Sequence, residues 1–155
     1  MNRNAAIAAV TLGCALLSHA AQARDEQQLF EFAPVLASTA GKDRFDDTVQ
    51  FFWSEQPYPA PLQVFEIHSS ERRVFTPTRN ERDACDETFI EALAALRDAA
   101  KEAGANAVVN IKSLYKNREF RSETQYECRV GYITTTVSLE GKLVKLPPPG
   151  PTPVR

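Results

Sequence analysis

Apolar residues recur at spacings of three and four in the second half of the chain, which is the period of one face of an α-helix. The positions that carry this pattern are Phe89, Leu93, Leu96, Ala100 and Ala103. Asp83 or Asp86 can cap the helix by accepting hydrogen bonds from free backbone amides, and Gly104 suits a left-handed C-cap. We therefore expect one long helix that begins at Asp83 or Asp86 and ends before Gly104. Its many alanines favour the helix and allow close packing on a sheet.

Alternating apolar and polar positions, the period of a β-strand, lie on both sides of this helix. The expected strands are 49–53, 62–68 and 72–76 before it, and 105–115, 124–130, 133–139 and 143–146 after it. Turns are expected at 69–71 and 140–141, a polar loop at 116–122, and a bulge at Gly131. These elements predict an α+β fold in which one long helix packs on an antiparallel sheet, with a β-α-β-β core and an N-terminal β extension.

The chain outside these elements divides into segments of different composition. Residues 24–47 are mixed in character and contain the breakers Pro34 and Gly41, so we expect them to be loosely structured. Residues 48–146 are expected to form a single α+β domain. The tail 147–155 holds five of the ten prolines, cannot join a packed core, and is expected to be extended and disordered.

The first residues have the pattern of a secretory signal peptide. Arg3 supplies a positive charge, and an apolar run of thirteen residues, 5–17, follows it. This run is too short to span a bilayer as a helix. Small residues at Ala21 and Ala23 then predict cleavage between Ala23 and Arg24. We expect residues 1–23 to be removed and the protein to be periplasmic or secreted by a bacterium.

An alternative interpretation of the leader is a bacterial lipobox. Leu12-Gly13-Cys14 resembles the end of such a motif, although Thr11 suits its first position poorly. Cleavage there would give a protein that contacts the membrane through a lipid on Cys14. Both interpretations stay open at this point, and the ordinary signal peptide is preferred because the apolar run continues past the cysteine.

Removal of the leader leaves Cys85, Cys128 and His68 as the cysteines and histidine of the mature chain. Two cysteines in an exported protein predict one structural disulfide, Cys85–Cys128. Closing so long a loop would stabilise the fold by about 4 kcal/mol if the effect is entropic. The alternative is a pair of metal-binding thiolates, but cysteine and histidine alone then provide too few ligands for a four-coordinate zinc site.

Charge and candidate chemistry point away from catalysis. The net charge of −2 excludes a generally basic nucleic-acid binder. His68 stands beside Ser69 and Ser70, but no GxSxG motif accompanies them. The acidic group at the helix start, Asp83, Asp86 and Glu87, suits capping and the helix dipole better than a metal. We therefore expect no catalytic residue, no cofactor and no metal ligand.

Basic and aromatic residues are the remaining candidates for binding. The arginines at 72, 73, 79, 82, 118 and 121 could form a basic face, and we expect Arg118 and Arg121 to contact a partner. That partner would be an envelope protein or a component of the cell wall or outer surface. The aromatic residues 51–53 and Tyr58 are expected to form core or a surface for self-association.

The block 85–146 resembles the small β-α-β-β domain of the YbjQ-type family, which is labelled heavy-metal-binding. The residues that carry the resemblance are Ala92, Leu93, Leu96, Ala100, the run 104–109, Tyr115, Val137, Gly141 and Val144. The block is also similar to the family of the envelope-stress lipoprotein of the Rcs pathway in enterobacteria, which ties its helix region to a strand by disulfides. GANAVVNIKS together with YEC is similar to small exported proteobacterial proteins labelled "excinuclease ATPase subunit".

The resemblance implies a non-enzymatic binding or stress-sensing module of the cell envelope. A metal- or small-ligand-binding periplasmic protein is the alternative, and an enzyme is third. Members of the resembled family can form ring oligomers, which makes a homo-oligomer an expectation here. No GxxxxGK[ST] loop occurs, so we expect no ATP binding despite the ATPase label.

Overall fold

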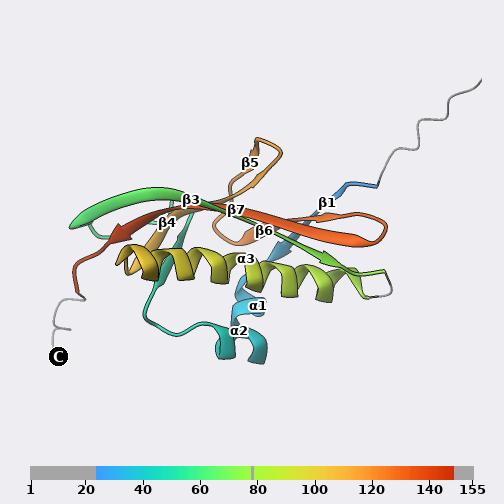
Figure 1. The fold of residues 1–155 in the computed structure, drawn as a ribbon, viewed down its shortest axis with the longest axis horizontal. Coiled ribbons are helices and arrows are strands. Elements are labelled where there is room, and N and C mark those ends of the chain that lie inside the picture. The colour runs from blue at the N-terminus through green and yellow to red at the C-terminus, as the bar shows by residue number, and fades with distance from the viewer. Residues whose placement is uncertain (1–23, 78, 149–155) are drawn as a thin grey trace, which may run out of the picture.

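A computed structural model describes residues 24–77 and 79–148 as one long helix on a curled seven-stranded sheet (Figure 1). The strands are β1 (Glu26–Glu31), β2 (Gln50–Trp53), β3 (Gln63–Phe75), β4 (Ala107–Tyr115), β5 (Arg118–Phe120), β6 (Gln125–Val130) and β7 (Thr134–Lys145). The helices are α1 (Ala33–Ala37), α2 (Thr39–Arg44) and α3 (Glu81–Ala103). The predicted α+β class is therefore confirmed. The leader 1–23, with Cys14 and the predicted cleavage site after Ala23, and residues 149–155 of the predicted tail lie outside the described residues.

Strand β7 is the centre of the sheet. It pairs with β3 along one side, and β4 and β6 share its other side. The sheet then extends through β6 to β1 and through β4 to β2 and β5. The expectation of an antiparallel sheet needs one correction, because β2 runs parallel to β4. The connection between them contains β3 and α3, and a crossover of this length can join parallel strands.

Helix α3 begins earlier than its acidic residues suggest. Asn80 is the N-cap, and its side chain accepts hydrogen bonds from the backbone amides of Arg82 and Asp83. The prediction that Asp83 or Asp86 caps the helix was therefore wrong, because the free amides reach Asn80 first. Gly104 ends the helix in the left-handed region, at φ 76°, as predicted.

The core lies between α3 and one face of the sheet. Phe89, Leu93 and Leu96 are fully buried there, in one cluster with Val137 and Leu139 of β7. The disulfide Cys85–Cys128 is present, with an S–S distance of 2.04 Å and a Cα–Cα distance of 5.9 Å. It joins the second turn of α3 to β6 and lies entirely inside the core. The predicted disulfide is confirmed.

A bulge in β4 places two apolar residues three positions apart, Val108 and Ile111, on the same face of the strand. The pairing of β4 with its neighbours shifts around Asn110, whose φ of 53° lies in the left-handed region. The Asn110 side chain donates to the carbonyl oxygen of Ser54 and accepts from the hydroxyl of Tyr58. As a result, Val108 and Ile111 face α3, whereas Val109 packs on the opposite side with a second, smaller cluster.

The segment 24–47, predicted to be loosely structured, is ordered as β1, α1 and α2. Each of the six residues of β1 pairs with a residue of β6, almost one hundred positions along the chain. Ser38 caps α2 by accepting from the amide of Gly41. The prediction failed because the backbone partners of β1 are distant in sequence and leave no local period to detect.

Two predicted turns and one predicted loop are also wrong. Residues 69–71 and 140–141 lie inside β3 and β7, which pair with each other through both positions, Ser69 opposite Glu140. The predicted loop 116–122 contains β5 after a two-residue turn whose residues both have positive φ. Gly131 lies in the turn between β6 and β7, where its amide donates to the carbonyl oxygen of Thr134, and forms no bulge.

Among the described residues, no helix combines the length and the apolar character that a bilayer-spanning helix needs.

Gly141 gives a test of the packing between β7 and β4. A Cβ atom there would clash with Cγ1 of Val108 and lie 3.2 Å from Cγ1 of Ile111. We expect Gly141→Ala to lower the free energy of unfolding by about 1–3 kcal/mol, measured by urea denaturation. In a Val108→Ala background the same change should cost less, because the clashing methyl group is absent. An equal loss in both backgrounds would contradict this explanation.

Candidate functional site

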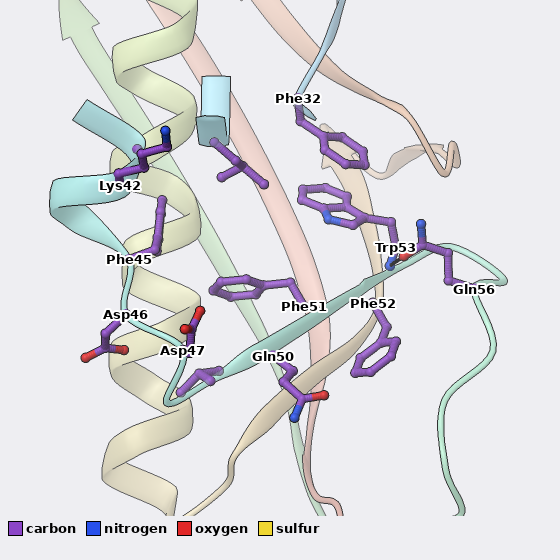
Figure 2. Close-up of a pocket in the computed structure, with 13 residues that line it drawn as sticks. Phe32, Lys42, Phe45, Asp46, Asp47, Gln50, Phe51, Phe52, Trp53 and Gln56 are labelled. Carbon is purple, nitrogen blue, oxygen red and sulfur yellow. Dashed lines mark hydrogen bonds between the residues drawn. The ribbon is translucent and has the colours of Figure 1, made fainter. Parts of the chain in front are cut away.

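An aromatic groove of about 740 Å³ opens between α2 and the outer edge of β2 (Figure 2). Aromatic and apolar side chains line most of it, and polar side chains line the rest. The lining residues are Phe32, Leu36, Gly41, Lys42, Phe45, Asp46, Asp47, Val49, Gln50, Phe51, Phe52, Trp53 and Gln56. They come from the α1–α2 segment and from β2 with its flanking loops. In the sequence these two parts of the chain were assigned to different segments, 24–47 and 48–146.

The floor of the groove is part of the core. Phe32 stacks on Trp53, with ring centroids 4.2 Å apart, and both side chains are buried. Trp53 in turn stacks on Phe89 of α3, at 5.7 Å. The floor is therefore held by the same helix that organises the sheet, and it cannot shift without disturbing the core.

Two half-buried rings form the wall nearest to solvent. Phe45 meets Phe51 edge to face, with centroids 5.6 Å apart and ring planes 83° apart. Arg97 of α3 holds Phe45 in place, because its guanidinium lies 5.7 Å from the Phe45 ring and also donates to the carbonyl oxygen of Arg44. Figure 2 shows the Phe51 side chain pointing from β2 into the space beside Phe45. An apolar group placed there would contact both rings.

The outer edge of β2 is open along the groove. The amides of Gln50 and Ser54 both donate to β4, to the carbonyl oxygens of Asn106 and Ile111. Backbone groups alternate in direction along a strand, so those of Phe51 face outward. Within the described part of the chain β2 ends the strand order and pairs only with β4.

The rim of the groove is acidic at the end of α2. Asp46 accepts from the hydroxyl and the amide of Thr48 and from the ammonium of Lys101, which is 3.0 Å away. The Thr48 hydroxyl, followed by Lys101, lowers the pKa of Asp46 from 3.8 to about 2. Asp47 is exposed beside it. Asp46 is therefore ionised over the whole physiological pH range, with Lys101 as its partner, and Lys42 lines the same rim.

The arginines do not form the continuous basic face that the sequence suggested. Most of them pair with carboxylates, in the pairs Arg73–Glu71, Arg79–Glu87, Arg82–Asp86 and Arg121–Glu119. Arg118 is exposed on β5, and Arg121 also lies 3.7 Å from Glu55. Arg121 is not among the residues that line the groove and instead lines a separate cavity with Lys112 and Glu140. Arg118 and Arg121 stay predicted partner contacts.

The structure does not bring the candidate catalytic and metal residues together. Ser69 donates to Glu140, whereas Ser70 donates to the carbonyl oxygen of Ala92 on the other face of β3. Asp86 accepts hydrogen bonds from Arg82 and from the hydroxyl of the buried Tyr126, so both of its carboxylate oxygens already have partners. Among residues 24–77 and 79–148, no three His, Cys, Asp or Glu side chains are arranged to hold a metal ion.

Sequence reasoning found one wall of the groove and missed the other. The aromatic run 51–53 was expected to be core or an association surface, and Trp53 is indeed buried. The opposite wall was missed because residues 24–47 were expected to lack structure. One signal could have predicted the helix of this wall. Ser38 is a residue type that caps helices, and Phe45 follows it after a short helical segment.

Fold and groove together define a class of protein: a small disulfide-linked α+β domain with one long helix on a mixed sheet and an aromatic groove at one sheet edge. Comparison of the chain with models of protein families, with curated proteins and with solved structures finds no match. The resemblance to the YbjQ-type family therefore stays a prediction.

The rim carboxylate can be tested by NMR titration. We expect Thr48→Val to raise the pKa of Asp46 from about 2 towards 3.8, because the hydroxyl that lowers it most is removed. A lowered pKa means that ionised Asp46 favours folding above its ordinary pKa, and this contribution is lost as pH falls through about 2. Thr48→Ser keeps the hydroxyl and should leave the pKa unchanged. An equal rise in both variants would contradict the assigned cause.

Proposed function

We propose that this chain is an exported, non-enzymatic binding module whose aromatic groove receives an extended segment of a partner polypeptide. The observation that carries the proposal is the continuity of the groove with the open outer edge of β2. An extended segment can add to such an edge through main-chain hydrogen bonds while its side chains enter a neighbouring pocket.

The backbone of Phe51 supplies the pairing groups in this proposal. Its amide and carbonyl face the groove, while the neighbouring outward amide, that of Trp53, already donates to Oε1 of Gln56. A partner strand would therefore form its main-chain hydrogen bonds with the amide and the carbonyl of Phe51. Every second side chain of this strand would then point towards the rings of Phe45 and Phe51.

Chemistry at the rim favours an apolar side chain flanked by a basic one. The rings of Phe45 and Phe51 accept an apolar or aromatic group, which gains free energy when it leaves water. Asp47 lies next to these rings, is exposed and attracts positive charge, whereas Asp46 is already paired with Lys101. Arg121 lies outside the groove, and it is the proposed contact for an acidic group elsewhere on the same partner.

Binding is a better proposal than catalysis or metal binding for this groove. Enzymatic sites need convergent titratable groups, and the charged residues that line the groove, Lys42, Asp46 and Asp47, all lie on its rim. The two mature cysteines form the disulfide and offer no thiolate to a metal. The disulfide also supports an oxidising location outside the cytoplasm, periplasmic or secreted.

Selection from a library of random decapeptides displayed on phage tests the groove directly. We expect selected peptides to bind the purified protein. The Phe51→Glu substitution should lower the affinity for a synthetic copy of a selected peptide by at least about tenfold. Hydrogen exchange should show that bound peptide protects the Phe51 amide, which side-chain contact alone would not do.

Phe75→Glu is the control, because Phe75 is an exposed ring on β3, 65% accessible, and is not among the residues that line the groove. It should leave peptide affinity unchanged. Peptides that bind Phe51→Glu as tightly as the wild type, or leave exchange at Phe51 unaltered, would overturn the proposal.

Export and the disulfide are tested by the intact mass of the protein recovered from the envelope of its host. We expect a chain that begins at Arg24 and gains two hydrogens on reduction. A lipid-modified mass that begins at Cys14 would instead establish a membrane-anchored protein. A mass that reduction does not change would contradict the disulfide and reopen metal binding by thiols.

A further inference from the structure

A second, smaller cavity of about 190 Å³ lies on the face of the sheet opposite α3. It is lined by Arg24, Asp25, Arg73, Tyr115, Lys116, Arg129, Gly131, Thr134 and Thr136. Thr135 contacts Thr88 of α3, so its neighbours in β7, Thr134 and Thr136, point to the opposite face. Figure 1 shows the β4–β5 hairpin rising from that same face. The cavity is independent of the aromatic groove.

Arg129 is the most deeply placed charge in this cavity. Its residue is 7% exposed, and the Tyr115 ring lies 5.0 Å from its guanidinium carbon. Among the described residues, its side chain donates one hydrogen bond, from Nε to Glu127. No buried side-chain nitrogen in this part of the chain lacks a partner, so the two terminal amino groups must reach solvent, which the cavity provides.

Three further cations surround this guanidinium, and their partners lie mostly outside the cavity. Arg73 donates to the hydroxyl of Thr136 and lies 3.9 Å from Glu71, while Arg24 pairs with Glu26 and Glu81. Lys116 pairs with Asp25 at 2.8 Å. The lining therefore contains four cations, one carboxylate and two threonine hydroxyls.

Lys116 forms an ion pair with Asp25, the one carboxylate in the lining of the cavity. Its hydrogen bond to Asp25, with a smaller contribution from Arg129, lowers the pKa of Asp25 from 3.8. Asp25 is therefore ionised and engaged at neutral pH, and it leaves the donors of Arg73 and Arg129 to the cavity.

From this arrangement we infer that the cavity is a binding site for a tetrahedral oxyanion, of the phosphate type. The guanidinium of Arg129 presents paired N–H donors that match such an anion, and Arg73 and Thr136 supply donors from other directions. The volume is several times the roughly 30 Å³ of one water in the liquid, so an oxyanion fits. Inorganic phosphate and a phosphate monoester on a larger molecule share this chemistry.

Titration of ¹⁵N-labelled protein with inorganic phosphate, at constant ionic strength and neutral pH, tests the site. We expect saturable shifts of the Gly131 and Thr134 amides at phosphate concentrations below about 10 mM. Arg73→Gln should weaken binding by at least about fivefold, and its side chain is 59% exposed, so the fold should tolerate the change. Arg72→Gln is the matched control, because this substitution removes the same charge from the same strand. The Arg72 side chain lies on the α3 face, away from the cavity.

Absence of saturation, or an equal weakening by Arg72→Gln and Arg73→Gln, would overturn the inference, since the shifts would then report net charge alone. The same titration with glycerol 3-phosphate distinguishes the two sources. Binding at least as tight as that of inorganic phosphate assigns the site to a phosphorylated molecule, whereas binding that is at least tenfold weaker assigns it to the free anion. Either result is independent of the peptide experiment on the aromatic groove.

Discussion

The bond between Cys85 and Cys128 is the contact on which the rest of the fold depends. It fixes the start of α3 on β6, and the residues around it form one continuous cluster. The hydroxyl of Tyr126 donates to Asp86 at 2.6 Å, and its ring stacks on Phe89 at 4.2 Å. A helix packed on a sheet can slide or rotate, and a covalent bond flanked by a hydrogen bond and a ring stack removes that freedom.

The same cluster gives the aromatic groove its rigid floor. Phe89 contacts both Phe32 and Trp53, so the rings beneath the groove are extensions of the helix–sheet core. Strand β6 also pairs with β1, which leads directly into α1 and α2. One wall of the groove is therefore held by ring contacts with α3, and the other follows the strand that pairs with β6. The disulfide joins α3 to β6. A site built this way is ordered before a ligand arrives, which lowers the entropic cost of binding.

The two faces of the sheet have different chemistry. The face against α3 is mostly apolar, and the hydroxyl of Ser70 on that face donates to the backbone carbonyl oxygen of Ala92. The opposite face carries ion pairs, among them the buried pair of Arg129 with Glu127 and the partly buried pair of Lys112 with Glu140. Buried ion pairs cost desolvation free energy, so the pair of Arg129 with Glu127 is a poor source of stability compared with the apolar contacts on the other face.

The sequence by itself determined the parts of this protein that depend on local period or on covalent chemistry. Helix α3, strand β4, the α+β class and the disulfide all follow from patterns within a few residues or from the two cysteines that remain after the predicted leader. Only the tertiary structure decided which strands pair. The order of 24–47 comes from pairing with β6, and the uninterrupted runs of β3 and β7 come from pairing with each other. The groove and the cationic cavity belong to this second group, since each is lined by residues that only long-range packing brings together. A helix satisfies its hydrogen bonds within its own sequence, whereas a strand satisfies them on a distant one, and this is the physical reason for the division.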